Sequence, residues 1–189
     1  MVAARETTLQ ELLEGTKQYQ VPLYQRTYSW KQAQLERLWR DVVQLAEDRV
    51  SSPELTHFIG SLVLAPSPAN GAVGVMEFLV VDGQQRLTTL SLLLCAIRDH
   101  RAQTEHPEHR DRINDQYLVN RWTPEQSRLK LLPTQADRAA HHQLASRRLV
   151  ASANSATVAP SNSTAGSSVP PTALYFSIAV LFPGAPPFS

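Results

Sequence analysis

The chain has 189 residues, a length that fits one medium domain or one domain with a tail. Its formal net charge is +1, so charge balance alone favours neither an acidic nor a basic partner. Residues 1–6 lack the apolar segment of a signal peptide, and no apolar run reaches the roughly 20 residues of a membrane span. The single cysteine, Cys95, can form no internal disulfide and lies in an apolar helical pattern. We therefore expect a cytoplasmic protein without a membrane segment, with Cys95 in its core.

The first part of the chain predicts two helices with an extended run between them. Residues 8–11 have the spacing of a capping box, which opens a short helix that Gly15 closes. An extended run precedes Pro22, because proline disfavours the helical conformation of the residue before it. Ser29 and Gln32 offer a second capping box. The helix after it carries one apolar stripe, at Leu35, Leu38, Val42 and Leu45.

The middle of the chain predicts two strands and a helix. Residues 58–64 and 77–81 have the apolar composition of buried strands, and a turn signal at Asn70-Gly71 separates them. The second strand stops at Asp82-Gly83, and an apolar helix follows over residues 85–98. Further elements are a mostly helical stretch beyond Pro107, an extended piece at 128–132, and a last helix that starts at Thr134 and Asp137 and ends near Arg148. The chain up to this point is predicted to have an α+β fold.

The composition changes abruptly after Arg148. Residues 149–189 contain no Asp, Glu, Lys, Arg or His, and Ser, Ala, Thr and Pro dominate. Such a segment has little to bury and is typical of a disordered tail, although the apolar run at 173–182 has the length of a strand. One hypothesis is a change of reading frame near residues 147–151, which would make the tail non-native. The alternative is a genuine disordered linker.

The strand, Asp-Gly turn and helix at residues 77–98 favour a phosphate site. The first N–H groups of a helix have no intrahelical partner and carry partial positive charge, so they attract anions. Gly83 allows positive φ and close approach of a ligand, and Arg86 offers a forked, charged contact to phosphate oxygens. Gln84 and Gln85 can orient a base, a sugar or a water, and Asp82 can hold Mg²⁺. The alternative is an ordinary turn, with Thr88 or Thr89 bonded to a helix carbonyl.

A second cluster, at residues 21–30, joins aromatic rings, a proline and an arginine in front of a helix. Gln25 and Arg26 can face the same ligand, and Tyr24, Tyr28 and Trp30 can stack on a base or form a pocket wall. The alternative for Tyr28 and Trp30 is that they anchor the following helix to the core.

Four blocks of the sequence, in this order, resemble the N-terminal domain of GmrSD-type restriction endonucleases. They are Val-Pro-x-Tyr-Gln-Arg-x-Tyr-x-Trp at 21–30, Phe-Ile-Gly-Ser-Leu-Val at 58–63, Val-Asp-Gly-Gln-Gln-Arg-Leu-Thr-Thr-Leu at 81–90 and Arg-Leu-Lys-Leu-Leu-Pro-Thr-Gln-Ala-Asp-Arg at 128–138. The resemblance covers roughly residues 8–148. It implies a ParB/sulfiredoxin-like fold, a small mixed sheet with packed helices, followed by a helical segment and the tail at 149–189.

The resemblance also implies a function. Members of this family bind and hydrolyse nucleoside triphosphates, GTP or ATP with Mg²⁺, in defence against phage DNA that carries modifications. Their nucleotide-handling motif carries over to Asp82, Gly83, Gln84, Gln85 and Arg86. The block across the pocket carries over to Pro22, Gln25 and Arg26. We expect catalysis from Asp82, Gln85 and Arg86, a metal at Asp82, and nucleotide contacts from the remaining residues, which are Pro22, Gln25, Arg26, Gly83, Gln84 and Thr88.

Full-length relatives continue their helical part and often add a His-Asn-His nuclease domain. No histidine cluster of that kind occurs here, and His141 and His142 are interpreted as surface residues, so DNA cleavage by this chain alone is not expected. The domain is then incomplete at its C-terminal end, and a separate nuclease subunit is a candidate partner beside modified DNA. Three hypotheses follow: a nucleotide-hydrolysing sensor of a restriction system, a nucleotide- or DNA-binding module without turnover, and an inactive remnant of a disrupted gene.

Overall fold

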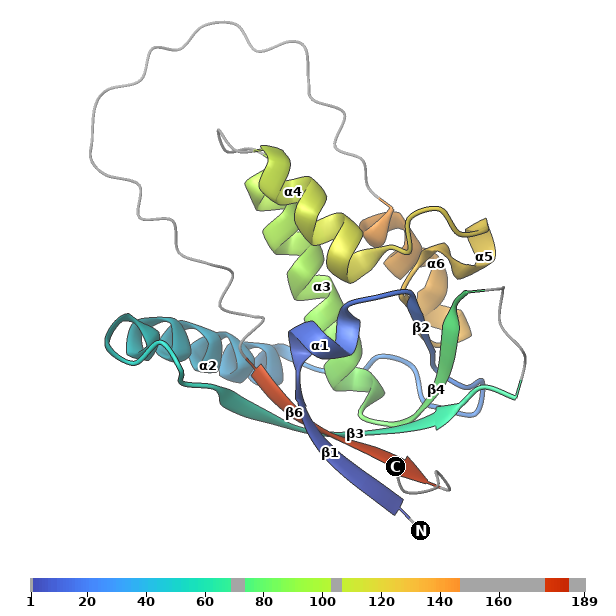
Figure 1. Cartoon of the computed structure of the whole chain (residues 1–189), viewed down its shortest axis with the longest axis horizontal. Helices are drawn as coiled ribbons and strands as arrows, with labels where there is room; N and C mark the ends of the chain where they lie inside the picture. Colours follow the sequence, from blue (N-terminus) through green and yellow to red (C-terminus); the bar gives the residue numbers. More distant parts are fainter. Residues whose placement is uncertain (1, 69–73, 103–106, 147–175, 184–189) are drawn as a thin grey trace, which may run out of the picture.

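The computed structural model describes residues 2–68, 74–102, 107–146 and 176–183 (Figure 1). Within these residues the chain forms a six-stranded mixed sheet with the strand order β1-β6-β3-β4-β2-β5. The strands are β1 (Val2–Thr8), β2 (Lys17–Gln20), β3 (His57–Pro66), β4 (Met76–Asp82), β5 (Leu131–Leu132) and β6 (Phe176–Pro183). The expected α+β architecture, a small mixed sheet with packed helices, is confirmed.

The helices of the described residues are α1 (Leu9–Leu13), α2 (Gln32–Ser51), α3 (Gln84–Arg101), α4 (Pro107–Ile113), the π-helix η1 (Asn114–Leu118), α5 (Glu125–Arg128) and α6 (Gln135–Ala145). Among them, α3 is the most buried, and it packs against α4, η1 and α6. On α3, Leu87, Leu90 and Leu94 belong to the same buried apolar cluster as Tyr19 of β2 and Val80 of β4. α3 therefore forms the centre of the core.

Cys95 lies on the buried side of α3, as expected. Burial raises the pKa of its thiol to about 11, because the apolar surroundings disfavour the thiolate. The thiol stays protonated at neutral pH, which fits a core residue rather than a nucleophile.

The directions of the strands bring two distant segments together. β2 runs parallel to β4 and to β5, whereas β3 runs antiparallel to β4. Because the carboxyl ends of parallel strands meet at one edge of a sheet, the loop at 21–31 after β2 lies beside the turn at Gly83 after β4. Ligand sites of sheets with parallel strands commonly lie at this edge.

One expected capping box is present and the other is not. Thr8 caps α1, with its side chain bonded to the Glu11 N–H and the Glu11 side chain bonded back. The capping box expected at Ser29 and Gln32 is wrong: α2 starts after Lys31, whose N–H donates to the Gln34 side chain. Ser29 stays in the loop because its own N–H donates to the side chain of Gln85, 56 residues away.

The apolar run at 173–182 contributes a strand, β6. This strand pairs in parallel with β3 and antiparallel with β1. The pairing partner β1 was not predicted, since residues 2–8 are largely polar. The remaining part of the tail, residues 149–175 and 184–189, lies outside the described residues, as does the expected turn at Asn70-Gly71. The reading-frame hypothesis and the linker alternative therefore stay predictions.

Candidate functional site

The turn between β4 and α3 depends on Gly83. This residue is the N-cap of α3 and has φ +87° and ψ 10°, a left-handed conformation that favours glycine. A Cβ atom built on it would collide with the side chain of Leu62 and lie 2.9 Å from the Ser61 carbonyl oxygen. The positive φ is as expected, and β3 makes a close approach to this glycine.

The N-terminus of α3 is open. The first intrahelical bond runs from the Leu87 N–H to the Gly83 oxygen at 3.0 Å. No side chain of the described residues caps this end, and its first turn contains no acidic residue. The N–H groups of Gln84, Gln85 and Arg86 are therefore available to an anion, which the helix dipole also favours.

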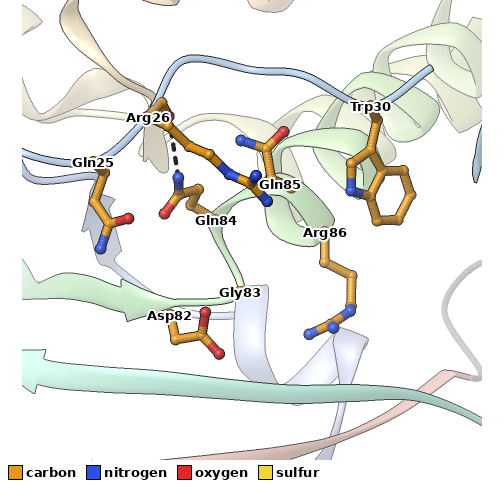
Figure 2. A pocket seen from close by; sticks show the side chains of 8 residues that line it. All are labelled: Gln25, Arg26, Trp30, Asp82, Gly83, Gln84, Gln85 and Arg86. Carbon is orange, nitrogen blue, oxygen red and sulfur yellow. Dashed lines mark hydrogen bonds between the residues drawn. The ribbon is translucent and has the colours of Figure 1, made fainter.

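The two glutamines of the motif hold the neighbouring loop. The Gln84 amide donates to the Arg26 carbonyl at 3.1 Å, as Figure 2 shows. The Gln85 amide donates to the Thr27 carbonyl at 3.0 Å, and its oxygen accepts from the Ser29 N–H at 2.8 Å. Both side chains are buried. Their role in this structure is to fix the loop at 21–31 on the first turn of α3.

Three further contacts complete this attachment. The Gln25 amide donates to the Val81 carbonyl at 2.7 Å. The Tyr28 hydroxyl lies 2.9 Å from the Thr89 hydroxyl, and the Tyr28 N–H donates to the Asp137 carboxylate at 2.8 Å. Tyr28 thus has the anchoring role that the sequence left open as the alternative.

A small cavity forms where the loop meets α3. Its volume is about 190 Å³. It is lined by Gln25, Arg26, Trp30, Asp82, Gly83, Gln84, Gln85 and Arg86 (Figure 2). The structure therefore brings seven of the expected site residues together, and Trp30 forms part of the pocket wall, one of the two roles that the sequence left open for it. Two expected residues lie elsewhere: Thr88 is buried within α3, and the Pro22 carbonyl accepts from the Gln25 N–H in a turn.

The two arginines of the cavity differ in how they are held. Arg26 is exposed, and its guanidinium has no hydrogen bond or ion pair with any described residue. Arg86 donates from Nη1 to the Ser61 carbonyl at 2.6 Å. Figure 2 shows Arg26 reaching from the loop across α3, while Arg86 extends from α3 toward β3. Arg26 is free to reorient toward a ligand, and Arg86 is partly fixed.

Gly60 makes the position of Arg86 possible, and sequence reasoning missed it. Gly60 has φ +109° and sits where the register of β3 and β6 shifts. A Cβ atom there would lie 2.7 Å from Cζ of Arg86. A glycine inside a strand signals a bulge or a close approach, and this signal was present in the block at 58–63.

Asp82 is the acidic residue of the cavity and is exposed. Within the described ranges, no group of three or more His, Cys, Asp or Glu residues is placed to hold a metal ion. Mg²⁺ is often held by one or two carboxylates together with phosphate oxygens and waters. A single carboxylate beside an anion site fits that mode and does not fit a cage made by the protein alone.

His141 is buried, which corrects its interpretation as a surface residue. It belongs to α6 and faces α3, with its Nε2 atom 3.0 Å from the hydroxyl of Ser91 on α3. Burial lowers the pKa of His141 to about 4, so the imidazole is neutral at pH 7. His142, its neighbour, is exposed as expected.

Comparison with known proteins identifies the family. No curated protein gives a significant match. A profile of the GmrSD restriction endonuclease N-terminal domain matches residues 9–166, which include every residue of the cavity and extend past the change of composition after Arg148. In the described part of the chain, no helix is long and apolar enough to cross a membrane. The chain therefore belongs to the family of N-terminal domains of GmrSD restriction endonucleases, which implies a role in a restriction system.

Proposed function

We propose that the cavity binds and hydrolyses a nucleoside triphosphate, GTP or ATP, as the sensor step of a modification-dependent restriction system. The observation that carries this proposal is the open N-terminus of α3, which faces a cavity lined by Arg26 and Arg86. Helix N–H groups and guanidinium groups together are the usual protein partners of phosphate oxygens.

The size of the cavity supports a binding mode in which only part of the nucleotide lies inside it. Sites for whole small molecules usually have roughly 300–1,000 Å³, whereas this cavity has about 190 Å³. The phosphates then lie inside, against the first turn of α3, and the ribose and base lie outside. Trp30 lines the cavity, which supports a contact of its ring with the sugar or base.

The polar residues of the cavity have three different roles in the proposed reaction. Arg26 and Arg86 offset the charge that develops on the phosphoryl oxygens during transfer to water. Asp82 would hold Mg²⁺, which when bound neutralises phosphate charge. Gln84, Gln85 and Gln25 keep the loop, and with it Arg26, at the mouth of the cavity.

Arg26→Ala is the sharpest test, since it removes a side chain that no described residue needs as a partner. Binding of a labelled nucleotide and release of phosphate are measured on the same preparation. We expect nucleotide affinity to fall about tenfold or more, as for loss of one charged hydrogen bond of about 1.5–3 kcal/mol. Arg37→Ala, which removes an exposed arginine of α2, is the matched control. Unchanged affinity in Arg26→Ala, or an equal loss in Arg37→Ala, would contradict the proposal.

Binding without turnover is the second candidate, and the state of Gln85 favours it. Both ends of this amide are engaged by the loop backbone, so it is poorly placed to orient an attacking water. Tight nucleotide binding with no phosphate release would select this candidate. A remnant without a stable fold is distinguished from both by a thermal melt, in which a folded domain unfolds cooperatively.

Modified DNA and a separate nuclease subunit are the proposed partners. The support for DNA is the restriction role of the family. In this proposal nucleotide turnover in the cavity reports that DNA is bound elsewhere on the protein.

A further inference from the structure

The segment at residues 120–128, a loop that ends in the short helix α5 and is called the Trp122 loop below, presents an unusually exposed aromatic ring. Trp122 is 91% exposed and has φ +70°, a left-handed conformation that is uncommon for residues other than glycine. Such a conformation persists only where the surrounding structure enforces it, and it concentrates at binding sites. The π-helix η1, a rare element that is also frequent at functional sites, directly precedes the loop.

Hydrogen bonds close this loop at its base. The Asn120 N–H donates to the Arg128 carbonyl at 2.6 Å, and the Lys130 N–H donates to the Leu118 carbonyl at 3.0 Å. The Asn120 side chain donates to the Lys17 carbonyl, at the start of β2, at 2.9 Å. The loop is therefore fixed to the edge of the sheet.

A buried lysine next to this segment bonds it to three neighbouring elements. Lys130 is 3% exposed, and its ammonium group donates to the carbonyls of Leu13, Gly15 and Gln116 at 2.6–2.7 Å. These three acceptors belong to α1, the turn before β2, and η1. A backbone held on such a support loses little conformational freedom on binding, so contact through this segment is less costly in entropy.

One arginine lies against the ring, and a second belongs to the same segment. The Arg121 guanidinium is 5.4 Å from the centroid of the Trp122 ring and is oriented by Asp115 of η1 at 2.7 Å. Arg128, at the far end of the loop, is exposed and has no hydrogen bond or ion pair from its side chain to a described residue. Both arginines line a groove of about 460 Å³ whose lining also contains Arg110 and the carboxylates of Asp111, Asp115 and Glu125. Arg110 and Arg121 are paired with Asp111 and Asp115, so Arg128 is the arginine of this groove that has no ion pair with a described residue.

This region is separate from the nucleotide cavity. The loop leads into β5 and adjoins the start of β2, so it lies at the amino edge of the parallel strands, whereas the cavity lies at their carboxyl edge. Figure 1 shows α5 and the start of α3 at opposite ends of this part of the sheet.

We propose that the Trp122 loop is a nucleic-acid contact, in which the indole stacks on an unpaired base while Arg121 and Arg128 bind the flanking phosphates. The inference rests on the proposed function, in which DNA is a partner, and it specifies where on the protein the DNA binds. A π-face beside arginines is the usual combination for binding single strands or extruded bases, since every base can stack and every nucleotide carries a phosphate.

The test is a titration by fluorescence anisotropy with a labelled single-stranded DNA of about 12 nucleotides, a length within the range of such sites, and with the same sequence as a duplex. We expect Trp122→Ala to weaken single-strand binding about tenfold or more, and Trp122→Phe to retain most of it. Trp39→Ala is the matched control, because Trp39 is also exposed, at 58%, but lies on α2. Circular dichroism verifies that each variant is folded.

The proposal is overturned if Trp122→Ala binds the single strand as tightly as the parent chain, or if Trp39→Ala loses as much affinity. It is also overturned if Trp122→Ala changes only self-association, because the ring would then contact protein. Nucleotide binding by the Arg26→Ala variant distinguishes a failure of the proposed nucleotide site from a failure of the proposed DNA contact. A variant pair in which Trp122→Ala loses DNA and Arg26→Ala keeps nucleotide refutes the nucleotide site and leaves the DNA contact in place.

Discussion

At the carboxyl edge of β2 and β4, the buried amides of Gln84 and Gln85 bond to the backbone of the loop at 21–31. At the amino edge of the same strands, the buried ammonium group of Lys130 bonds to three backbone carbonyls below the loop at 120–128. Both edges thus use buried polar side chains to fix an irregular segment that apolar packing alone would leave loose.

What each edge exposes is different. The carboxyl edge leaves open the N–H groups of α3 and the guanidinium of Arg26, which suits an anion. The amino edge leaves open the ring of Trp122 with Arg121 beside it, which suits a stacked base. If the two edges are independent sites, a substitution that loosens the carboxyl edge should lower nucleotide affinity, whereas one that loosens the amino edge should not. This difference should hold even where the two substitutions cost similar stability.

The largest effect is expected at Gly83. Gly83→Ala forces a Cβ against Leu62 and the Ser61 carbonyl at a positive φ, and we expect a loss of about 3 kcal/mol or more in the free energy of unfolding. Gly74→Ala is the matched control, since Gly74 has φ +88° but nothing within 4 Å of the added atom. It is expected to lose only about 1 kcal/mol, the cost of the conformation itself. Urea denaturation measures both, and equal losses would show that the approach of β3 is unimportant.

Lys130→Met is expected to have the next largest effect. The variant keeps the apolar stem but leaves three carbonyls without their donor, for a loss of about 2–4 kcal/mol. Burial lowers the pKa of Lys130 to about 8, so the ammonium group is still mostly charged at pH 7. Lys31→Met, at an exposed position, is the control in the same denaturation assay. A loss below that of the control would show that water replaces the lysine.

A smaller effect is expected from acid. The pKa of His141 is about 4 in the folded chain, below its ordinary value of 6.5, because burial disfavours the imidazolium. The unfolded chain therefore binds more protons in this window, so stability falls as pH drops from about 6.5 to about 4, by up to about 3 kcal/mol. His141→Gln should flatten this part of the profile, measured as denaturation midpoints, whereas His142→Gln should not. An identical profile in His141→Gln would contradict the assignment.

Much of this fold is predictable wherever the signal is local. The capping box at Thr8, the strands at 58–64 and 77–81, and the helix after Asp82-Gly83 are each specified by a short run of residues. The structure places them close to the expected positions. β1 and the burial of His141 were missed because they depend on partners far along the chain. β1 pairs with residues 176–183, and His141 is covered only once α6 packs on α3.

In the candidate site, too, contacts between residues far apart in the sequence could not be predicted. The two motifs that meet in the cavity are recognisable from sequence, but the partners of their side chains are not. Nothing in the spacing indicates that Gln85 bonds to Thr27 and Ser29, 56–58 residues away, or that Arg86 rests on Gly60. Polar residues in a motif are easily assigned to a ligand, although here two of them hold the protein together.

The smallest predicted effect on stability is also the one that best tests the comparison of the two edges. Gln85→Met keeps the length of the side chain but breaks its bonds to Thr27 and Ser29, and we expect a loss of about 1–2 kcal/mol. The loop that carries Arg26 is then less well held, so nucleotide affinity should fall several-fold, although Gln85 is not the charged partner of the phosphates. Lys130→Met should cost more stability and leave nucleotide affinity unchanged, because its contacts lie at the opposite edge. Both quantities are measured by nucleotide titration and denaturation on the two variants. If both variants weaken nucleotide binding in proportion to their loss of stability, the two edges are one cooperative unit and the division into two sites fails.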